Sequence, residues 1–204
     1  MLTIVNNETT FRAAAVLVLL PLVSVAAYHR IRAARASPAE KLDRRQEGLA
    51  RAIALRLCGL AMWAGMFTYL ISPETMRWSQ VDLPGWLRWA GAGLGALSVP
   101  LLWWQMQALG RNLTDTVVTR ANATLVTSGP YRWVRHPLYM IALIFVASFS
   151  LLAANWFVLA SWVGAMAFLR ARTRIEEQKL VERFGDEYRA YMRRTGRYFP
   201  RLRR

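Results

Sequence analysis

The segment GPYRWVRHPLY, residues 129–139, is polar, basic and aromatic, and it stands directly before a long apolar run. The run extends from Leu138 to Leu169, and an acidic pair, Glu176 and Glu177, follows shortly after it. If the run forms a helical hairpin that enters a membrane and returns, the basic and acidic clusters meet at the same membrane face. Ionisable groups so close to the lipid boundary indicate a site that binds something polar.

Four apolar zones account for most of the chain. A bilayer crossing takes roughly 20 apolar residues, so each of the first three zones fits one helix. The fourth zone is too long for one helix and contains Asn155, which predicts two helices, Pro137–Ala154 and Asn155–Arg170, joined by a tight turn. At about 1.5 Å per residue each arm is about 25 Å long, which leaves open a hairpin that does not cross completely. The four zones are Phe11–Tyr28, Ala52–Ser72, Trp86–Leu109 and Leu138–Leu169.

The sequence therefore predicts an all-α, polytopic integral membrane protein with about five transmembrane helices and a cytoplasmic C-terminal helix. We expect one membrane domain over residues 1–204, with the three N-terminal helices in 1–109. Basic residues outnumber acidic ones seven to three in 29–51 and four to one in 110–136, whereas 73–85 holds one basic and two acidic residues. Because basic loops remain in the cytoplasm, the N-terminus is expected outside and the C-terminus inside.

Composition excludes several classes of function. The formal net charge is +15 although 55% of the residues are hydrophobic. The basic residues gather at predicted helix ends, which favours anionic lipid headgroups over nucleic acid as partners. One cysteine, Cys58, and two histidines, His29 and His136, are too few for a metal site, so none is predicted. Six tryptophans near helix ends predict an interfacial aromatic belt: Trp78, Trp86, Trp89, Trp103, Trp104 and Trp156.

The start of the hairpin has the features of a ligand site. Pro137 suits the first turn of a helix, which places His136 at or near its N-cap. Backbone N–H groups without intrahelical partners and a positive local field favour an anionic or hydrogen-bond-accepting ligand there. Arg132 and Arg135 alone are equally well explained as residues that hold the cytoplasmic boundary, whereas His136 and Tyr139, one turn apart, favour a site.

The tail 170–194 predicts a helix that continues out of the membrane, with a kink or break at Gly185. Arg172 and Glu176 are four residues apart and share a helix face. Because they lie at the membrane edge, opposite the predicted position of His136, a site is favoured over a surface ion pair. An apolar stripe with three- and four-residue spacing is interpreted as a packing surface and not as a cofactor site; it consists of Leu180, Phe184, Tyr188 and Tyr191.

Two motifs carry a resemblance to a known family. Residues 129–139 resemble its GPYRxxRHPxY block, and the stretches RTRIEE and FGDEYRAY within residues 172–191 resemble its RTxxEE and FGxxYxxY blocks. The family is that of the isoprenylcysteine carboxyl methyltransferases, membrane enzymes that use S-adenosylmethionine. The resemblance covers roughly residues 110–200, and it implies a cofactor-binding methyltransferase core in 110–204.

The resemblance also implies roles for single residues. Arg172 is implied to orient the carboxylate of a lipophilic or lipidated acceptor, and S-adenosylhomocysteine is the implied product. For Glu177 a second orientation stays open, outward toward Arg174 or Arg183. Two positions depart from the family pattern, since Ala123 replaces a frequent His and Ile141 a frequent Gly. The residues implied to bind S-adenosylmethionine are Thr119, Ala123, Thr124, Leu125, Val126, Tyr131, His136, Pro137, Leu138, Tyr139, Glu176 and Glu177.

Three other functions compete with this one. A phospholipid or amine N-methyltransferase would need a base near pH 7 to deprotonate the amine, and His136 could serve. An NADPH-dependent membrane reductase of the sterol-reductase type is disfavoured because Glu176 and Glu177 would repel the cofactor's 2′-phosphate. A helical scaffold without catalytic activity would have no use for the two cytoplasmic clusters.

Overall fold

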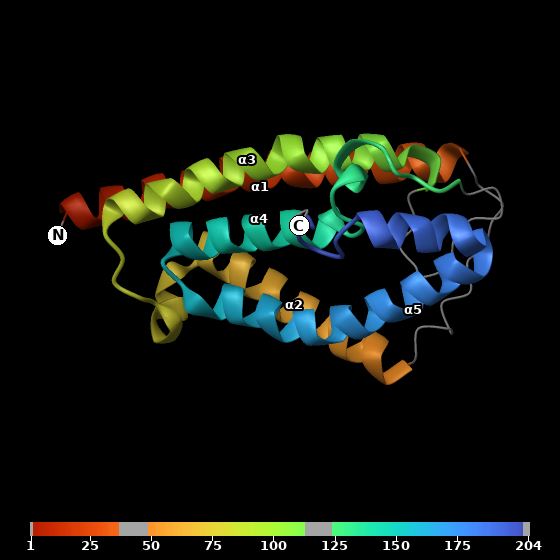
Figure 1. Ribbon diagram of the computed structural model, residues 1–204. Helices are drawn as coiled ribbons and strands as arrows, with labels where there is room; N and C mark the ends of the chain where they lie inside the picture. Colours follow the sequence, from red (N-terminus) through yellow and green to blue (C-terminus); the bar gives the residue numbers. More distant parts are fainter. Residues whose placement is uncertain (1, 37–48, 113–123, 202–204) are drawn as a thin grey trace.

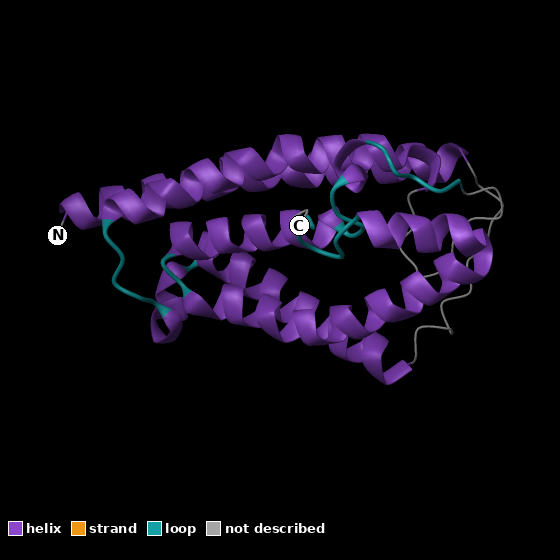
Figure 2. Ribbon diagram, in the orientation of Figure 1, coloured by secondary structure: helices purple, strands orange, loops and turns teal. Residues whose placement is uncertain are grey.

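The computed structural model describes residues 2–36, 49–112 and 124–201, and over these ranges the chain is a bundle of helices (Figures 1 and 2). The all-α prediction is confirmed. Across the three described ranges, β-type pairing is limited to two isolated bridges. In chain order the elements are α1 (Leu2–Ala36), α2 (Leu49–Ile71), η2 (Pro73–Ser79), α3 (Gly85–Leu109), η3 (Gly110–Asn112), η4 (Gly129–Arg132), α4 (Pro137–Ala153) and α5 (Trp156–Arg194).

Apolar sequence explains the long helices. Within α1 and α2, the stretches Glu8–Arg35 and Ile53–Ile71 are long and apolar enough to cross a membrane by length and composition. Helix α4 is also apolar, but its 17 residues make it only about 26 Å long. All six tryptophans predicted for the interfacial belt are exposed, so none of them is committed to the core.

The helices are arranged around α4 (Figure 1). Helices α1 and α3 run side by side along one flank, α4 packs against α3, and α2 packs against α5 on the other flank. Where these helices meet, large side chains are removed from the surface and pack closely against one another. The centre of this core includes Tyr69, Phe149, Leu152 and Val158, each at most 1% exposed.

The predicted break at Asn155 is the tip of the hairpin. Ala154 has a positive φ of 47°, and the Asn155 side chain caps α5 by accepting a hydrogen bond from the Phe157 amide at 3.0 Å. The Asn155 amide group donates to the Ser79 hydroxyl at 2.8 Å, which fastens η2 to the hairpin tip. The two-helix prediction for 137–170 is therefore confirmed, with the turn where it was expected.

Helix α5 continues past the apolar region and then reverses direction. Gly185 has φ 55° and ψ −127°, a backbone conformation that glycine adopts without a steric penalty from Cβ. The predicted kink is confirmed, and its consequence is large: residues 186–194 run back toward the start of α4, roughly in line with that helix (Figure 1). The reversal returns the chain to the start of α4, where the Tyr191 hydroxyl donates to the Tyr131 carbonyl at 2.6 Å.

At the opposite end of the bundle, one arginine joins four helices. Arg88 of α3 pairs with Glu8 of α1 at 2.8 Å and donates to the Leu152 carbonyl of α4 at 2.8 Å through Nε. The Tyr69 hydroxyl of α2 donates to Glu8 at 2.7 Å. No motif in the sequence indicates this cluster, which lies far along the bundle from the residues predicted to bind a ligand.

Candidate active site

The stretch 129–136 forms a compact turn that leads into α4. The buried Tyr131 hydroxyl accepts a hydrogen bond from Gln105 Nε2 of α3 at 2.7 Å, and burial raises the pKa of Tyr131, so the hydroxyl stays protonated at neutral pH. His136 is the N-cap of α4 and Pro137 stands in its first turn, as the sequence predicted. The His136 side chain makes no capping hydrogen bond, and its ring faces α5 instead.

Residues 195–201, here called the C-terminal strap, lie directly against this turn. The Arg135 amide donates to the Gly196 carbonyl at 2.9 Å, the His136 amide to the Arg197 carbonyl at 3.0 Å, and the Gly196 amide to the Trp133 carbonyl at 3.2 Å. These backbone bonds hold two segments about sixty residues apart in register. The strap therefore forms part of the same structural unit as the GPYRWVRHP segment.

Glu177 is the buried anion that holds the turn, the strap and α5 together. Its carboxylate accepts from Arg135 Nε at 2.8 Å and pairs with Arg197, and its side chain is only 4% exposed. The possible outward orientation toward Arg174 or Arg183 is wrong, because these two partners come from the inner side. Burial raises the pKa of Glu177, but the contacts with His136, Arg197 and Arg135 outweigh it and lower the pKa to about 2.

The neighbouring Glu176 belongs to a second group, here called the aromatic–acid cluster: His136, Tyr139, Thr173, Glu176 and Tyr198. Glu176 lies 3.6 Å from His136 Nδ1 and pairs with Arg172 Nε at 3.0 Å. The side chains of His136, Glu176 and Arg172 are 10%, 18% and 24% exposed. The Arg172–Glu176 pair is therefore partly buried and differs from an ion pair on a solvated helix surface. The two ends of the apolar hairpin do meet, as predicted from the sequence.

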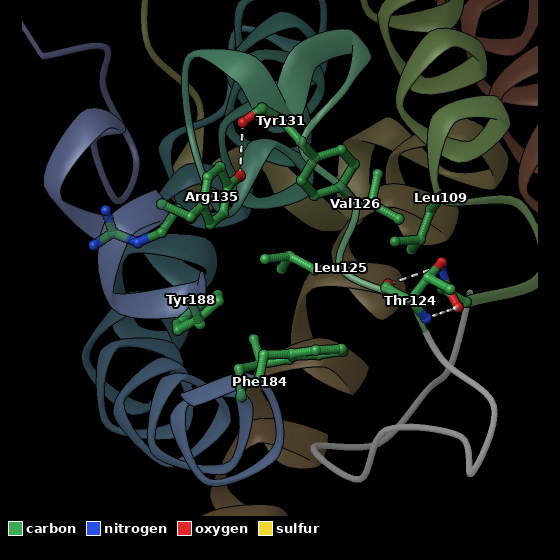
Figure 3. Close-up of a pocket in the computed structure, with 11 residues that line it drawn as sticks. Leu109, Thr124, Leu125, Val126, Tyr131, Arg135, Phe184 and Tyr188 are labelled. Carbon is green, nitrogen blue, oxygen red and sulfur yellow. Dashed lines mark hydrogen bonds between the residues drawn. The ribbon is translucent and has the colours of Figure 1, made fainter. Parts of the chain in front are cut away.

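A pocket of about 120 Å³ is lined in part by Arg135, the residue before His136 (Figure 3). Thr124, Leu125 and Val126 form one wall, and Tyr131 lies above them. The opposite wall comes from α5, whose apolar stripe packs against the body of the protein, as interpreted from the sequence, and also faces this pocket. All four residues of that stripe line the pocket: Leu180, Phe184, Tyr188 and Tyr191.

The residues implied to bind the cofactor thus fall into distinct places. Thr124, Leu125, Val126 and Tyr131 line the pocket, while His136, Tyr139 and Glu176 lie in the aromatic–acid cluster next to Glu177 and Arg172. Pro137 is buried at the helix start, and Leu138 packs against the α1–α3–α4 core. Thr119 and Ala123 lie outside the residues that the structure describes.

Several residues of the site were not found by sequence reasoning. Gln105 stands in an apolar zone, and Arg197 and Tyr198 stand in a basic tail that had been attributed to the membrane surface. Polar residues inside apolar helices are costly, and this signal would have found Gln105. Nothing in the local sequence indicates that the strap returns to Glu177, because the contact depends on the reversal of α5.

Residues 92–182 match the model of a family described as the isoprenylcysteine carboxyl methyltransferase (ICMT) family. The cobalt-zinc-cadmium resistance protein CzcN of Cupriavidus metallidurans is 32% identical over 161 residues, which cover 76% of this chain and 70% of that protein. The chain belongs to the isoprenylcysteine carboxyl methyltransferase family. The resemblance inferred from the two motifs is therefore confirmed.

Other members show how far the likeness extends. The protein-S-isoprenylcysteine O-methyltransferase of Rattus norvegicus is 30% identical over 62% of this chain, which spans 46% of that enzyme. A methanethiol S-methyltransferase of Pseudomonas deceptionensis is 36% identical over 36% of this chain and 28% of the enzyme. The solved structure of the eukaryotic intramembrane Ras methyltransferase ICMT superimposes with a TM-score of 0.55 at 20% identity, covering 92% of this chain and 67% of that one. This last likeness establishes a shared fold.

The pocket and the aromatic–acid cluster together indicate the kind of ligand that the site suits. Among the described residues no group of three or more His, Cys, Asp or Glu side chains is arranged to hold a metal ion. An apolar pocket beside a cluster of acids, aromatic rings and arginines suits a ligand with one flat apolar part and one charged part.

Proposed function

We propose that this chain is an integral membrane methyltransferase that uses S-adenosylmethionine and methylates the carboxylate of a lipophilic acceptor. The observation that carries the proposal is the junction of three segments at one place: the 129–136 turn, the 172–177 stretch of α5 and the strap. Their side chains combine an apolar pocket with buried acids and arginines. Family membership supports the reaction class, since relatives are named as methyltransferases.

The residues present fit this cofactor. Ligand pockets of drug size measure about 300–1,000 Å³, so the pocket of about 120 Å³ suits one ring system and not a whole cofactor. Leu125, Val126 and Phe184 supply apolar contact surface for the adenine. Glu176 then accepts hydrogen bonds from the ammonium group or the ribose hydroxyls. His136 Nε2 is buried and lies 3.5 Å from Glu177 Oε1, but it meets hydrogen-bond geometry with none of the described residues, which leaves it able to bind a polar group of the cofactor.

The reaction needs alignment more than proton transfer. When bound, S-adenosylmethionine supplies an electrophilic methyl group on a sulfonium, which an acceptor attacks in line. A carboxylate is already ionised at neutral pH, so no general base is required. Arg172 orients the acceptor carboxylate through a charge-assisted contact while Glu176 turns from Arg172 to the cofactor. Holding both reactants in line is the main contribution of the protein.

Membrane embedding explains how a lipophilic acceptor reaches the site. We propose five transmembrane helices, with the N-terminus outside and the site and C-terminus at the cytoplasmic face, because the basic loops alternate. A reporter active only in the cytoplasm gives signal when fused after Arg204 and none when inserted in 73–85. The opposite pattern would place the site on the other side of the membrane.

Ligand binding to the purified protein tests the cofactor assignment. S-adenosylmethionine and S-adenosylhomocysteine are each titrated by calorimetry, and NADPH serves as the competitor for the reductase alternative. Both adenosyl ligands should bind and raise the apparent unfolding temperature by mass action, whereas NADPH should not. Stabilisation by NADPH alone would reject the methyltransferase assignment.

Two variants separate the donor from the acceptor. Glu176→Gln should weaken S-adenosylmethionine binding, whereas Arg172→Ala should leave that affinity nearly unchanged and lower turnover roughly 30- to 1000-fold, the effect of about 2–4 kcal/mol. Glu182→Gln, an exposed acid on the same helix, is the matched control and should change neither. If both site variants bind and turn over like the parent, the placement of the site is wrong.

The product identifies the acceptor class. A radiolabelled methyl group on a carboxylate forms an ester, which mild base releases as volatile methanol. A methyl group on nitrogen or sulfur is not released in this way, so base-stable label from membrane extracts would show an amine or thiol acceptor instead. The S-methyltransferase among the relatives makes the thiol the second candidate.

A further inference from the structure

Three rings converge beside Glu176, and one of them comes from the strap. The His136 and Tyr139 rings are nearly parallel, with centroids 5.8 Å apart and 13° between their planes. The Tyr198 ring closes the group at 6.1 Å from His136 and 6.2 Å from Tyr139, and it is tilted against both. The three centroids therefore form a triangle with sides of about 6 Å.

Tyr198 is held in this position by several independent contacts. Its hydroxyl donates to Thr173 Oγ1 at 3.0 Å, and Thr173 Oγ1 in turn donates to the Leu169 carbonyl of α5 at 2.8 Å. The preceding residue, Arg197, pairs with buried Glu177 and accepts a backbone hydrogen bond from His136. A ring anchored through both its hydroxyl and its backbone is preorganised, which lowers the cost of ordering it around a ligand.

The charges around the triangle indicate what it binds. Neither carboxylate is left for a further cation. Glu177 pairs with Arg135 and Arg197, and Glu176, which pairs with Arg172 in this structure, turns to the ammonium group or ribose of the cofactor in the proposed complex. Aromatic faces carry negative quadrupole density and attract cations within about 6 Å of the ring centroid. The ring faces therefore offer the cluster a further means of stabilising a positive charge.

We propose that Tyr198 is a cofactor-contacting residue whose ring, together with those of His136 and Tyr139, recognises the sulfonium cation of S-adenosylmethionine. This inference rests on the proposed function and adds a specific consequence to it. Transfer breaks the methyl–sulfur bond, leaves its electron pair on sulfur and forms the methyl–oxygen bond of the ester. The sulfur thereby becomes a neutral thioether, and the ring triangle distinguishes the charged donor from the uncharged product.

The experiment compares one charged and one neutral ligand. Dissociation constants for S-adenosylmethionine and S-adenosylhomocysteine are measured on the full chain at pH 8, above the ordinary pKa of imidazole. Tyr198→Leu removes the aromatic face and should weaken S-adenosylmethionine binding roughly 2- to 30-fold, with little effect on S-adenosylhomocysteine. Tyr198→Phe keeps the face and should retain most of the preference.

A neighbouring residue provides the control. Phe199→Leu makes the matching change at a side chain of the same strap that is 68% exposed, and it should leave both constants unchanged. If Tyr198→Leu loses both ligands equally, the ring only supports the fold, and this inference is overturned. Tyr198→Met, which fills similar volume without a ring, repeats the comparison if the Leu variant does not fold.

The outcomes also separate the inference from the function it depends on. If the parent protein binds neither adenosyl ligand, the proposed function fails. If the parent binds both ligands, and the ratio of the two dissociation constants in Tyr198→Leu and Tyr198→Met equals the ratio in the parent, the function stands and the role of Tyr198 fails.

Discussion

Replacing Glu177 by Gln keeps the shape of the side chain and removes the charge that Arg135 and Arg197 share. The size of the effect follows from the carboxylate itself. The pKa of Glu177 is about 2 in the folded chain, against an ordinary value of 4.5. At about 1.36 kcal/mol per pH unit, the ionised form stabilises the fold by about 3 kcal/mol relative to the neutral form. Glu177→Gln, which resembles the neutral form, should lose about this amount.

The same reasoning predicts a dependence on pH. Because the pKa is lower in the folded chain than in the unfolded chain, the stabilisation is complete above about pH 4.5 and is lost as the pH falls toward 2. About half of it should be gone at pH 3. Glu177→Gln has no carboxylate to protonate there, so the difference in stability between parent and variant should shrink over this range.

Unfolding in detergent micelles, followed between pH 7 and pH 3, measures both effects. Glu182→Gln is the matched control, because Glu182 is an exposed acid on the same helix and its loss should cost less than about 0.5 kcal/mol. The reasoning is refuted if Glu177→Gln costs no more than the control, or if the gap between parent and variant does not narrow in acid.

Three further changes test the packing that supports the site. Gly91→Ala places a Cβ 2.8–2.9 Å from atoms of α4, so it should cost about 1–3 kcal/mol in an unfolding titration. Glu8→Gln removes the anion held by Arg88 and should lower stability by about 1.5–3 kcal/mol, with S-adenosylmethionine affinity unchanged in calorimetry, because the cluster is remote from the site. Gly196→Ala puts a Cβ into the space taken by the Phe199 carbonyl oxygen, which displaces the strap. Cofactor binding should then weaken at least tenfold while far-UV circular dichroism stays helical; unchanged binding would remove the strap from the site.

Local sequence was sufficient to predict the hairpin and the pairing of its ends. A polar Asn155 inside an apolar run indicated the turn, and Pro137 indicated where α4 begins. Asn155 and Pro137 each influence only the residues next to them, so the spacing of apolar residues and the presence of turn-forming residues are enough to locate the turn and the start of α4. The juxtaposition of His136 with Glu176 followed from hairpin geometry alone, because the two arms start and end at the same level.

Contacts that depend on the path of the chain could not be predicted in this way. Gly185 indicated a kink, but the angle of the kink, and with it the contact between Arg197 and Glu177, depends on tertiary packing. The Glu8–Arg88 pair joins residues 80 positions apart, whereas Arg12 is the basic residue nearest to Glu8 in the sequence. Arg12 instead donates to the Leu70 carbonyl at 3.0 Å.

The return of the strap to Glu177 also affects the order in which the site forms during synthesis. Arg197 follows Glu177 by 20 residues and comes after the end of α5, so it leaves the ribosome after all of α4 and α5 have been made. Until then Glu177 lacks one of its two arginine partners, and burying the carboxylate at that stage is unfavourable. We therefore expect the nascent chain to keep this part of the helix hydrated and the site open. If the proposed function is correct, tight binding of S-adenosylmethionine is expected only after the helices are in place.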